Sequence, residues 1–151
     1  MNASLVLGQS DFISHIFLID QKHMLEPFAV AVDGSGNIFI ADTGNSRVLE
    51  FKPPLSNGMN ASVVIGEPDF TTVAPAVDQT SVGVPISVSV DANGNLWVSD
   101  NLNMRVLEFQ PPFVNGMKAS LVLGEPDFVT GGPAFVGPSS LNGTFGAAFV
   151  P

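Results

Sequence analysis

The chain has 151 residues, of which 45% are hydrophobic, 13% are charged and none is cysteine. Its 14 acidic and 5 basic side chains give a formal net charge of −9. That charge argues against nucleic acid or an anionic membrane as a partner, because both are bound through Lys and Arg. The hydrophobic share is typical of a chain that buries a core, and the absence of cysteine excludes disulfides and thiolate metal sites.

A short motif occurs three times along the chain at a fixed interval. Residues 2–12 read NASLVLGQSDF, residues 60–70 read NASVVIGEPDF and residues 118–128 read KASLVLGEPDF, so the interval is 58 residues. The residues between the copies follow the same interval without insertion or deletion. A fixed period of this size predicts one supersecondary unit that stacks on copies of itself.

Each unit contains four short apolar runs separated by residues that favour turns. The loops Asp33-Gly-Ser-Gly-Asn37 and Asp91-Ala-Asn-Gly-Asn95 predict tight hairpins, because Gly and Asn tolerate positive φ and Asp bonds nearby amides. No run has helical spacing, and several runs are apolar on both faces, so the unit is an all-β, four-stranded antiparallel meander covered by neighbouring sheets. The predicted strands of the first unit are 28–33, 37–42, 47–52 and 61–66, and those of the second lie 58 residues later.

The connection that leads into each unit is its most variable part. Residues 12–26 and 70–84 share little except the pairs Asp20-Gln21 and Asp78-Gln79. A connection of this length in a compact fold is either functional or held by its own packing. The sequence leaves both alternatives open.

The segment PFAVAVDGSGNIFIADTGNSRV, residues 27–48, resembles the NHL repeat, and residues 85–106 resemble it again. The resemblance covers about 26–67 and 84–125, although this chain has a longer connection between units than the family. It implies a partial β-propeller of NHL type, with two complete four-stranded antiparallel blades and flanking strands. Protein partners, and less often RNA or glycan partners, are typical of the family, and the negative charge disfavours RNA.

The repeat predicts how the chain is organised. We expect a terminal strand of a preceding blade at 1–12, a first blade with its leading connection at 13–67, a second at 68–125, and the start of an incomplete third blade at 126–151. Residues 145–150 resemble the first strand of a unit. Isolated blades expose apolar faces, so we expect either other copies of the chain or the missing blades of a longer chain to cover them. A monodisperse monomer in light scattering would contradict self-association.

The turn between the second and third strands carries the same three polar residues in both units. A functional interpretation makes them a ring of polar groups that contacts a ligand, at the end of the propeller where the long connections also lie. A structural interpretation makes them a turn-stabilising ion pair, with the asparagine in the left-handed backbone region. The candidate binding residues are Asp42, Asn45, Arg47, Asp100, Asn103 and Arg105.

Other polar groups are explained more simply by turns. His15, Asp20 and His23 offer zinc ligands, but Val73 and Ser81 replace both histidines in the second unit. The loop that begins at Asp33 lacks the alternating oxygen ligands of a calcium site. The Glu-Pro-Asp-Phe motifs at 67–70 and 125–128 are interpreted as strand-ending turns. The triplets at Asn2, Asn60 and Asn142 fit the glycosylation acceptor pattern, but two of them are repeat residues at the start of the fourth strand, so they are interpreted as turn chemistry. We predict no catalytic residue, metal or cofactor.

The sequence favours a non-catalytic NHL-repeat module for protein binding or scaffolding, as part of a longer array or as a self-assembling unit. Two alternatives stay open: a fragment of a metal-dependent propeller enzyme of the lyase or lactonase kind, and a purely structural self-assembling repeat. A glycan partner also stays open. No signal peptide or transmembrane pattern is visible, and the compartment stays unassigned, with an extracellular or cell-surface place open for a fragment of a larger protein.

Overall fold

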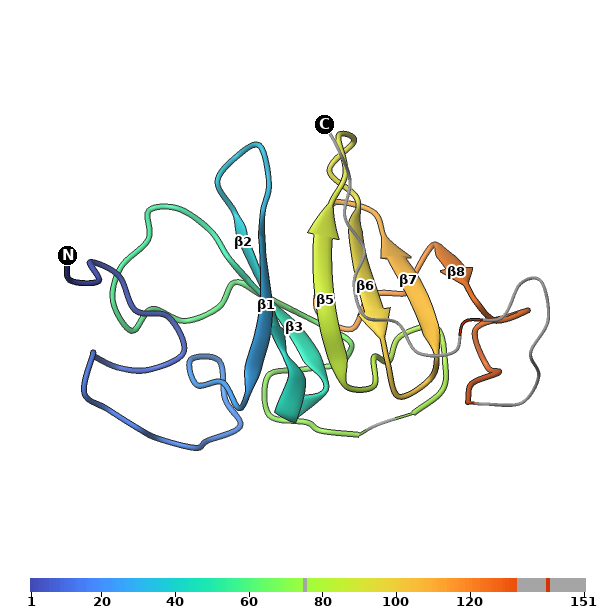
Figure 1. The fold of residues 1–151 in the computed structure, drawn as a ribbon, viewed down its shortest axis with the longest axis horizontal. Coiled ribbons are helices and arrows are strands. Elements are labelled where there is room, and N and C mark those ends of the chain that lie inside the picture. Colours follow the sequence, from blue (N-terminus) through green and yellow to red (C-terminus); the bar gives the residue numbers. More distant parts are fainter. Residues whose placement is uncertain (75, 133–140, 142–151) are drawn as a thin grey trace.

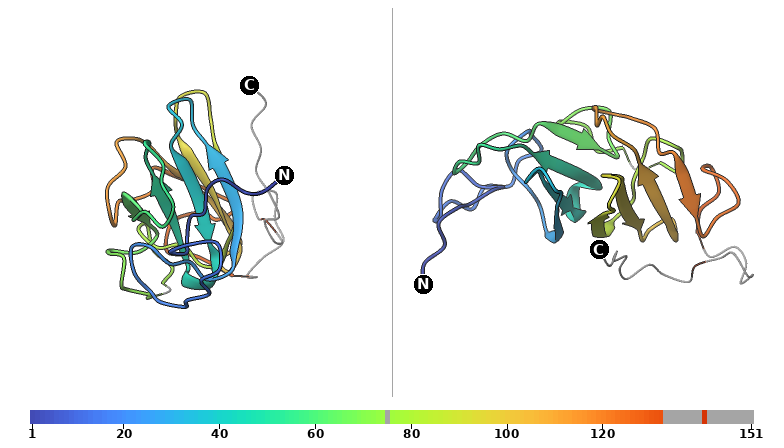
Figure 2. Two further views of the ribbon diagram at one scale, coloured as in Figure 1. Left: turned by 90° about the vertical axis from the view of Figure 1, so that its left-hand side faces the viewer. Right: turned by 90° about the horizontal axis from the view of Figure 1, so that it is seen from above.

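The computed structural model describes residues 1–74, 76–132 and 141. These residues form two four-stranded antiparallel sheets that follow one another along an arc (Figures 1 and 2). In each sheet the strands lie in chain order, so the prediction of an all-β fold with two meander blades is confirmed. Sheet 1 contains β1 (Pro27–Val32), β2 (Ile38–Asp42), β3 (Arg47–Phe51) and β4 (Val63–Ile65), and sheet 2 contains β5 (Pro85–Val90), β6 (Leu96–Asp100), β7 (Arg105–Phe109) and β8 (Leu121–Leu123), with one 3-10 turn, η1 (Thr43–Asn45), in sheet 1.

The first hairpin of each sheet has the predicted turn chemistry. Asp33 Oδ1 accepts the backbone N–H groups of Ser35 and Asn37 at 2.8 and 2.9 Å. The amide of Gly36 donates to the carbonyl of Asp33 at 3.0 Å, and Gly36 has φ of +82°, a region that residues with a Cβ rarely occupy. The same contacts recur around Asp91.

Paired residues share a face of an antiparallel sheet, which defines two faces of sheet 1. Its proximal face carries Val30, Ile40, Leu49 and Val64, and its distal face carries Ala29, Ala41, Val48 and Ile65. By the same register, the proximal face of sheet 2 carries Val88, Val98, Leu107 and Val122, and its distal face carries Ser87, Ser99, Val106 and Leu123.

The distal face of sheet 1 packs on the proximal face of sheet 2. Ala41, Val48 and Ile65 join Val98 and Leu107 in one buried core, and all five are 0% exposed. The alanines of sheet 1 are small, so the two sheets approach closely. A second, smaller core covers the proximal face of sheet 1 between its outer strands and the loops.

Residues 1–12, which we expected to form a strand, form none. A strand needs a neighbouring strand for its backbone groups, and β3 already pairs with β4. The segment nevertheless lies against sheet 1 as β4 lies against sheet 2: Val6 N–H donates to Asn57 Oδ1 at 3.0 Å, and Val64 N–H donates to Asn115 Oδ1 at 3.0 Å. Residues 1–12 therefore lie where the fourth strand of a preceding sheet would lie, although they do not form a strand.

The expected start of a third blade is only partly described. Residues 126–132 contain no strand, and the strand predicted at 145–150 lies outside the described residues. Among the described residues, no helix has the length and hydrophobicity needed to cross a membrane.

Gly66 joins the end of β4 to the next connection, and we expect Gly66→Ala to lower the free energy of unfolding by about 2 kcal/mol. Its φ is +93°, and an added Cβ would lie 2.8 Å from Cβ of Val82. Gly34→Ala is the control, because Gly34 has no positive φ and nothing lies within 4 Å of an added Cβ. Urea denaturation measures both, and equal midpoints would contradict the steric argument.

Candidate functional site

The turn after β2 is held by a fully buried arginine. Arg47 is 0% exposed, and its Nε donates to Asp42 Oδ2 at 2.7 Å. Its Nη1 donates to the carbonyl of Phe70 at 2.6 Å, and its Nη2 donates to the carbonyls of Asp20 and His23 at 2.9 and 3.0 Å. One side chain thus joins the turn to the connection before β1 and to the connection after β4.

The carboxylate of Asp42 organises the same turn. It accepts the backbone N–H of Leu25 at 2.7 Å on Oδ1, and the side-chain amide of Asn45 donates to both of its oxygens at 3.1 and 3.0 Å. The expectation that Asn45 holds the left-handed position is wrong: Ser46 has φ of +53° instead. The side chain of Asn45 makes the hydrogen bonds to Asp42, and the next residue, Ser46, adopts the left-handed conformation.

Sheet 2 repeats this network. Arg105 Nε donates to Asp100 Oδ2 at 2.8 Å, Nη1 to the carbonyl of Phe128 at 2.6 Å, and Nη2 to the carbonyls of Asp78 and Ser81 at 3.0 Å each. Burial raises the pKa of Asp100, and its bonds to Asn103 and Arg105 act in the opposite direction. The left-handed residue is again the one after the asparagine, Met104, at +53°.

The structure therefore brings the candidate binding residues together as two separate buried clusters, one for each sheet. The predicted ion pairs are present, with both partners 0% exposed by side chain in each pair. Their polar atoms are used to hold turns and connections. A role in ligand binding stays a prediction for Asp42, Asn45, Arg47, Asp100, Asn103 and Arg105.

The shared Asp-Gln pair fastens each long connection to its own sheet. The side-chain amide of Gln21 donates to the carbonyl of Ala61 at 2.8 Å, and Ala61 N–H donates to the carbonyl of Gln21 at 2.8 Å. Gln79 and Ala119 make the same two bonds. The connections are thus held by their own packing, which was one of the two alternatives that the sequence left open. The acceptors are backbone carbonyls, and a sequence pattern does not mark these.

Of the three possible zinc ligands, the structure joins two. His23 Nδ1 lies 2.8 Å from Asp20 Oδ2, while the ring of His15 packs edge-on against Phe17 at a centroid distance of 4.6 Å. Among the described residues, no group of three or more His, Cys, Asp or Glu side chains is arranged to hold a metal ion. Asp20 and His23 form a local contact that Asp78 and Ser81 reproduce in sheet 2.

The Glu-Pro-Asp-Phe motifs are turns, as predicted. Asp69 Oδ1 accepts the N–H groups of Thr71 and Thr72 at 2.8 Å each, and these bonds, the one from Thr71 first, lower the pKa of Asp69 to about 2. Glu67 is 2% exposed and accepts the N–H of Ala74, and burial raises its pKa. Each carboxylate holds backbone of the following connection.

Comparison with known families identifies the first of these units. Residues 26–51 match the family described as NHL repeat. The chain carries an NHL repeat. The matched segment contains β1, β2 and β3 together with Asp42 and Arg47, so it includes the ion pair of the buried network. No curated protein matches the chain.

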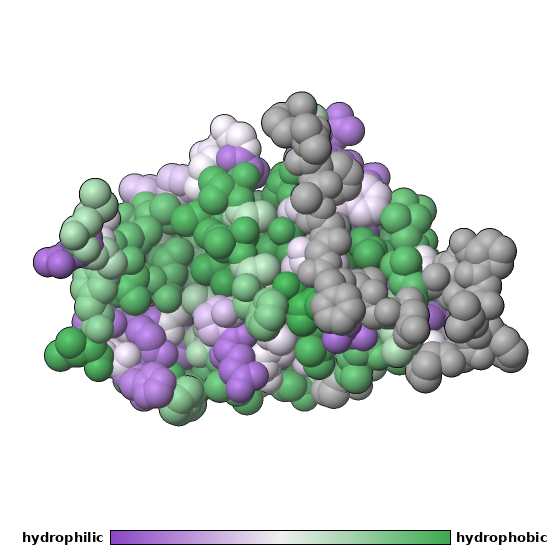
Figure 3. Space-filling view, in the orientation of Figure 1, coloured by the Kyte–Doolittle hydropathy of each residue, from purple (hydrophilic) through white to green (hydrophobic). Residues whose placement is uncertain are grey.

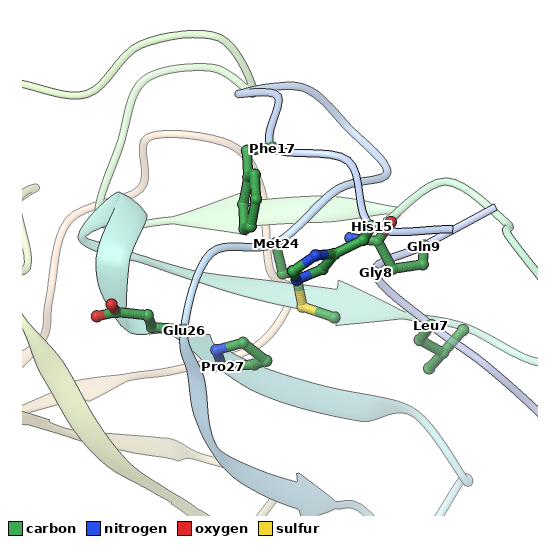
Figure 4. Close-up of a pocket in the computed structure, with 8 residues that line it drawn as sticks. All are labelled: Leu7, Gly8, Gln9, His15, Phe17, Met24, Glu26 and Pro27. Carbon is green, nitrogen blue, oxygen red and sulfur yellow. The ribbon is translucent and has the colours of Figure 1, made fainter. Parts of the chain in front are cut away.

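A hollow of about 220 Å³ lies where the NHL repeat begins, between the amino-terminal segment and the start of β1 (Figure 4). His15 and Met24 both line it, whereas the carboxylate of Glu26 points away from them. In sheet 2 the equivalent of Pro27 is Pro85, which is buried, and its carbonyl accepts the hydroxyl of Thr43 at 2.5 Å. The hollow beside sheet 1 therefore corresponds to the place in sheet 2 where Pro85 contacts the turn after β2 of sheet 1.

A second hollow, of about 340 Å³, lies between the hairpin after β1 and residues 111–113 at the opposite end of the blades. Glu50 lines it with a side chain that is 1% exposed, and its Oε2 lies 3.3 Å from Nζ of Lys52. Burial raises the pKa of Glu50, and the contact with Lys52 offsets this in part. Burial therefore disfavours the ionised form of Glu50 in the folded state.

We expect Glu50→Gln to stabilise the protein at pH 7. The pKa of Glu50 in the folded state lies above the ordinary value of 4.5, so ionisation costs the folded state more than the unfolded state, and the cost vanishes below about pH 4.5. Urea denaturation should show the gain at pH 7 and none at pH 4. Glu108→Gln is the control, because Glu108 accepts hydrogen bonds from Ser120 and Gln110. A gain that persists at pH 4 would contradict the assignment.

The inner strand of sheet 1 presents an apolar surface. Phe28, Val30 and Val32 point to the proximal face and are 72%, 64% and 60% exposed, and Figure 3 shows apolar side chains gathered over β1. In sheet 2, Val88 stands at the place of Val30 and is 6% exposed, because sheet 1 covers it. Sequence reasoning assigned both strands alike, since nothing in their residues tells which face has a neighbour.

Proposed function

We propose that the chain is a non-catalytic NHL-repeat module that binds or scaffolds protein through the open proximal face of sheet 1. One observation carries the proposal: β1 exposes Phe28, Val30 and Val32 at 60% or more on one face, while the equivalent Val88 is buried. Contiguous apolar patches of this kind on a soluble surface mark sites of protein contact.

The chemistry of the face favours protein over a charged or sugar ligand. It is formed by Phe28, at a register shift between Pro27 and Ala29, and by two valines further along β1, with Ile40 on the same face at 9% exposure. A flat apolar strip without hydrogen-bonding side chains recognises another apolar surface by shape and desolvation. Glycans need polar groups that match their hydroxyls, and this strip has none.

Four carboxylates support a non-catalytic role because each has a structural task. Asp42 and Asp100 hold turns and arginines, Glu67 holds backbone, and Asp69 lies exposed in a turn with a pKa of about 2. General acid–base catalysis needs a carboxyl with a pKa near the working pH that reaches a pocket. These four serve as structural acceptors, and Glu50, whose pKa burial raises and which lines the second hollow, is the exception.

A photo-reactive benzoylphenylalanine in place of Phe28 tests the proposal. In cells of the native source, irradiation should join position 28 to another polypeptide and give a larger band that contains this chain. The control carries the same group in place of Val129. Positions 13, 71 and 129 are equivalent in the three units, and all three are exposed. Because position 71 is exposed even in the middle unit, this position lies away from the contact between units. Absence of any polypeptide adduct at position 28, with the chain folded by circular dichroism, would refute protein binding at this face.

A further inference from the structure

We infer that the protein partner of the open face is a second copy of this chain, which docks by strand exchange: residues 3–8 of one copy replace β8 on β7 of the next. This inference rests on the proposed protein-binding role and names its partner. It combines the open face of sheet 1, an identical hexapeptide at the two ends of the described fold, and the loose seat of β8.

Residues 3–8 and residues 119–124 have the same sequence, Ala-Ser-Leu-Val-Leu-Gly. The second copy contains β8 and pairs with β7, whereas the first has no strand neighbour and forms no strand. A segment with the sequence of β8 has every side chain that the edge of β7 recognises. Exchange of identical elements between copies has a low thermodynamic cost, because the interactions that β8 gives up on β7 are re-formed there by the incoming segment.

The amino-terminal segment is already placed for this role. Its bond from Val6 N–H to Asn57 repeats the bond from Val64 N–H of β4 to Asn115, and Leu7 packs on the core of sheet 1. It thus lies against sheet 1 as a fourth strand of a preceding sheet. The inner part of the same face, over β1, is open for the other three strands of such a sheet.

The seat of β8 is looser than that of its counterpart in sheet 1. Leu121 and Leu123 are 41% and 46% exposed, whereas Val63 and Ile65 at the equivalent positions of β4 are 6% and 0% exposed. β4 is covered because sheet 2 packs on the distal face of sheet 1, to which Val63 and Ile65 belong. β8 lacks that cover among the described residues, so less burial opposes its release.

Strand exchange also covers the open proximal face of sheet 1 and the exposed outer edge of sheet 2 in one step. In the exchanged pair, residues 3–8 of the first copy form the outer strand of sheet 2 of the second copy. The distal face of that sheet 2 would then pack on the open proximal face of sheet 1 of the first copy. This is the contact that sheet 1 and sheet 2 already make inside one chain. If residues 3–8 stayed in place and β8 were kept, both segments would occupy the same position, so docking without exchange is sterically excluded.

The exchange has a defined register. In sheet 2, Val106 pairs with Leu123, Leu107 with Val122 and Glu108 with Leu121. Because residues 3–8 and 119–124 are identical, exchange would replace Leu123, Val122 and Leu121 with Leu7, Val6 and Leu5, respectively. Ser4 takes the place of Ser120, whose hydroxyl donates to Glu108 at 2.5 Å, so the exchanged strand keeps this bond.

The distal face of sheet 2 keeps small residues where sheet 1 has them. Ser87, Ser89 and Ser99 stand where sheet 1 has alanines, so close approach is preserved. The hydroxyls of Ser89 and Ser99 are already buried in the single chain without a hydrogen-bond partner among the described residues, so docking of a second copy adds no new desolvation cost for them.

Two matched proline variants test the exchange. The N–H groups of Val6 and Val64 donate to Asn57 and Asn115, so in this segment the N–H of the next residue is the one directed at the third strand of the sheet. A proline lacks that N–H, and Leu7 and Leu123 have identical neighbours in sequence. Leu7→Pro should abolish the concentration-dependent increase in mass seen by light scattering, whereas Leu123→Pro, by releasing β8, should increase it. Docking with β8 retained predicts that Leu123→Pro weakens association, and that result would overturn the inference, as would a monomeric parent chain at high concentration.

Disulfide trapping gives a second readout that does not depend on stability. The chain has no cysteine, and residues 1–12 and β7 lie at opposite ends of the molecule (Figure 1). A mixture of Leu7→Cys chains and Val106→Cys chains under a mild oxidant should form a mixed covalent dimer. Val6→Cys mixed with Val106→Cys is the control, because adjacent strand residues point to opposite faces. No mixed dimer, or equal trapping in the control, refutes the exchange.

The two proposals fail in distinguishable ways. A photo-adduct at position 28 that contains a different polypeptide, with no trapping between positions 7 and 106, leaves protein binding intact and refutes self-exchange. The absence of any adduct at position 28 refutes the proposed function itself. An adduct made of two copies, together with trapping in register, supports both.

Discussion

Arg47→Met should lower the free energy of unfolding by about 3–5 kcal/mol, the cost of removing one partner of a buried ion pair. Methionine has a similar length and fills the space, so the loss comes from the electrostatics. Asp42 would keep a buried charge without its partner, and the carbonyls of Asp20, His23 and Phe70 would lose their donors. Urea denaturation at fixed chain concentration measures the change.

The repeat supplies an internal check on this result. Arg105→Met should cost a similar amount, because Arg105 makes the same set of bonds in sheet 2. Lys118→Met removes the same charge from an exposed side chain and should change stability by less than about 0.5 kcal/mol. A loss below about 1 kcal/mol for both arginine variants would show that the network is not a main support of the blades.

The buried arginines explain why two short sheets hold such long connections. Each guanidinium uses its planar set of N–H groups on one carboxylate and three carbonyls that come from two different connections. A sheet therefore orders the segments on both sides of it through one side chain. Local loss of the network should free the connections before the strands.

The strands and the first hairpins were predictable from the sequence, because apolar runs and turn residues are local signals. The pairing of Asp42 with Arg47 was also visible, since two units carried it at the same spacing. The carbonyl acceptors of Arg47 were not, because any residue offers a carbonyl and no side chain marks the site. The pair Asp20-Gln21, shared by both connections, was the one available signal that the connections are anchored.

Two expectations failed because they depended on neighbours and not on local sequence. The segment 1–12 has the sequence of a strand, but a strand exists only where another strand receives its hydrogen bonds. Asparagine favours the left-handed region, but the side-chain amide of Asn45 donates hydrogen bonds to Asp42, and Ser46 adopts the left-handed conformation instead. In both cases tertiary contacts outweigh an intrinsic preference.

The same dependence on neighbours separates the two equivalent valines of the inner strands. Val88→Asp should lower the free energy of unfolding by about 3–5 kcal/mol, because Val88 is 6% exposed in the core between the sheets and a carboxylate there would be buried without a partner. Val30→Asp should change it by about 0.5 kcal/mol or less, because Val30 is 64% exposed. The measurement is urea denaturation at a chain concentration at which the parent is monomeric.

At higher concentration the second variant should change its behaviour. Val30→Asp places a charge on the face that another copy would cover, so it should remain a folded monomer where the parent chain associates. If Val30→Asp were as destabilising as Val88→Asp even in dilute solution, the proximal face of sheet 1 would already be covered in the single chain. The difference between the two valines therefore reports whether a neighbouring sheet covers each position, and strand exchange would supply that cover to sheet 1 from outside the chain.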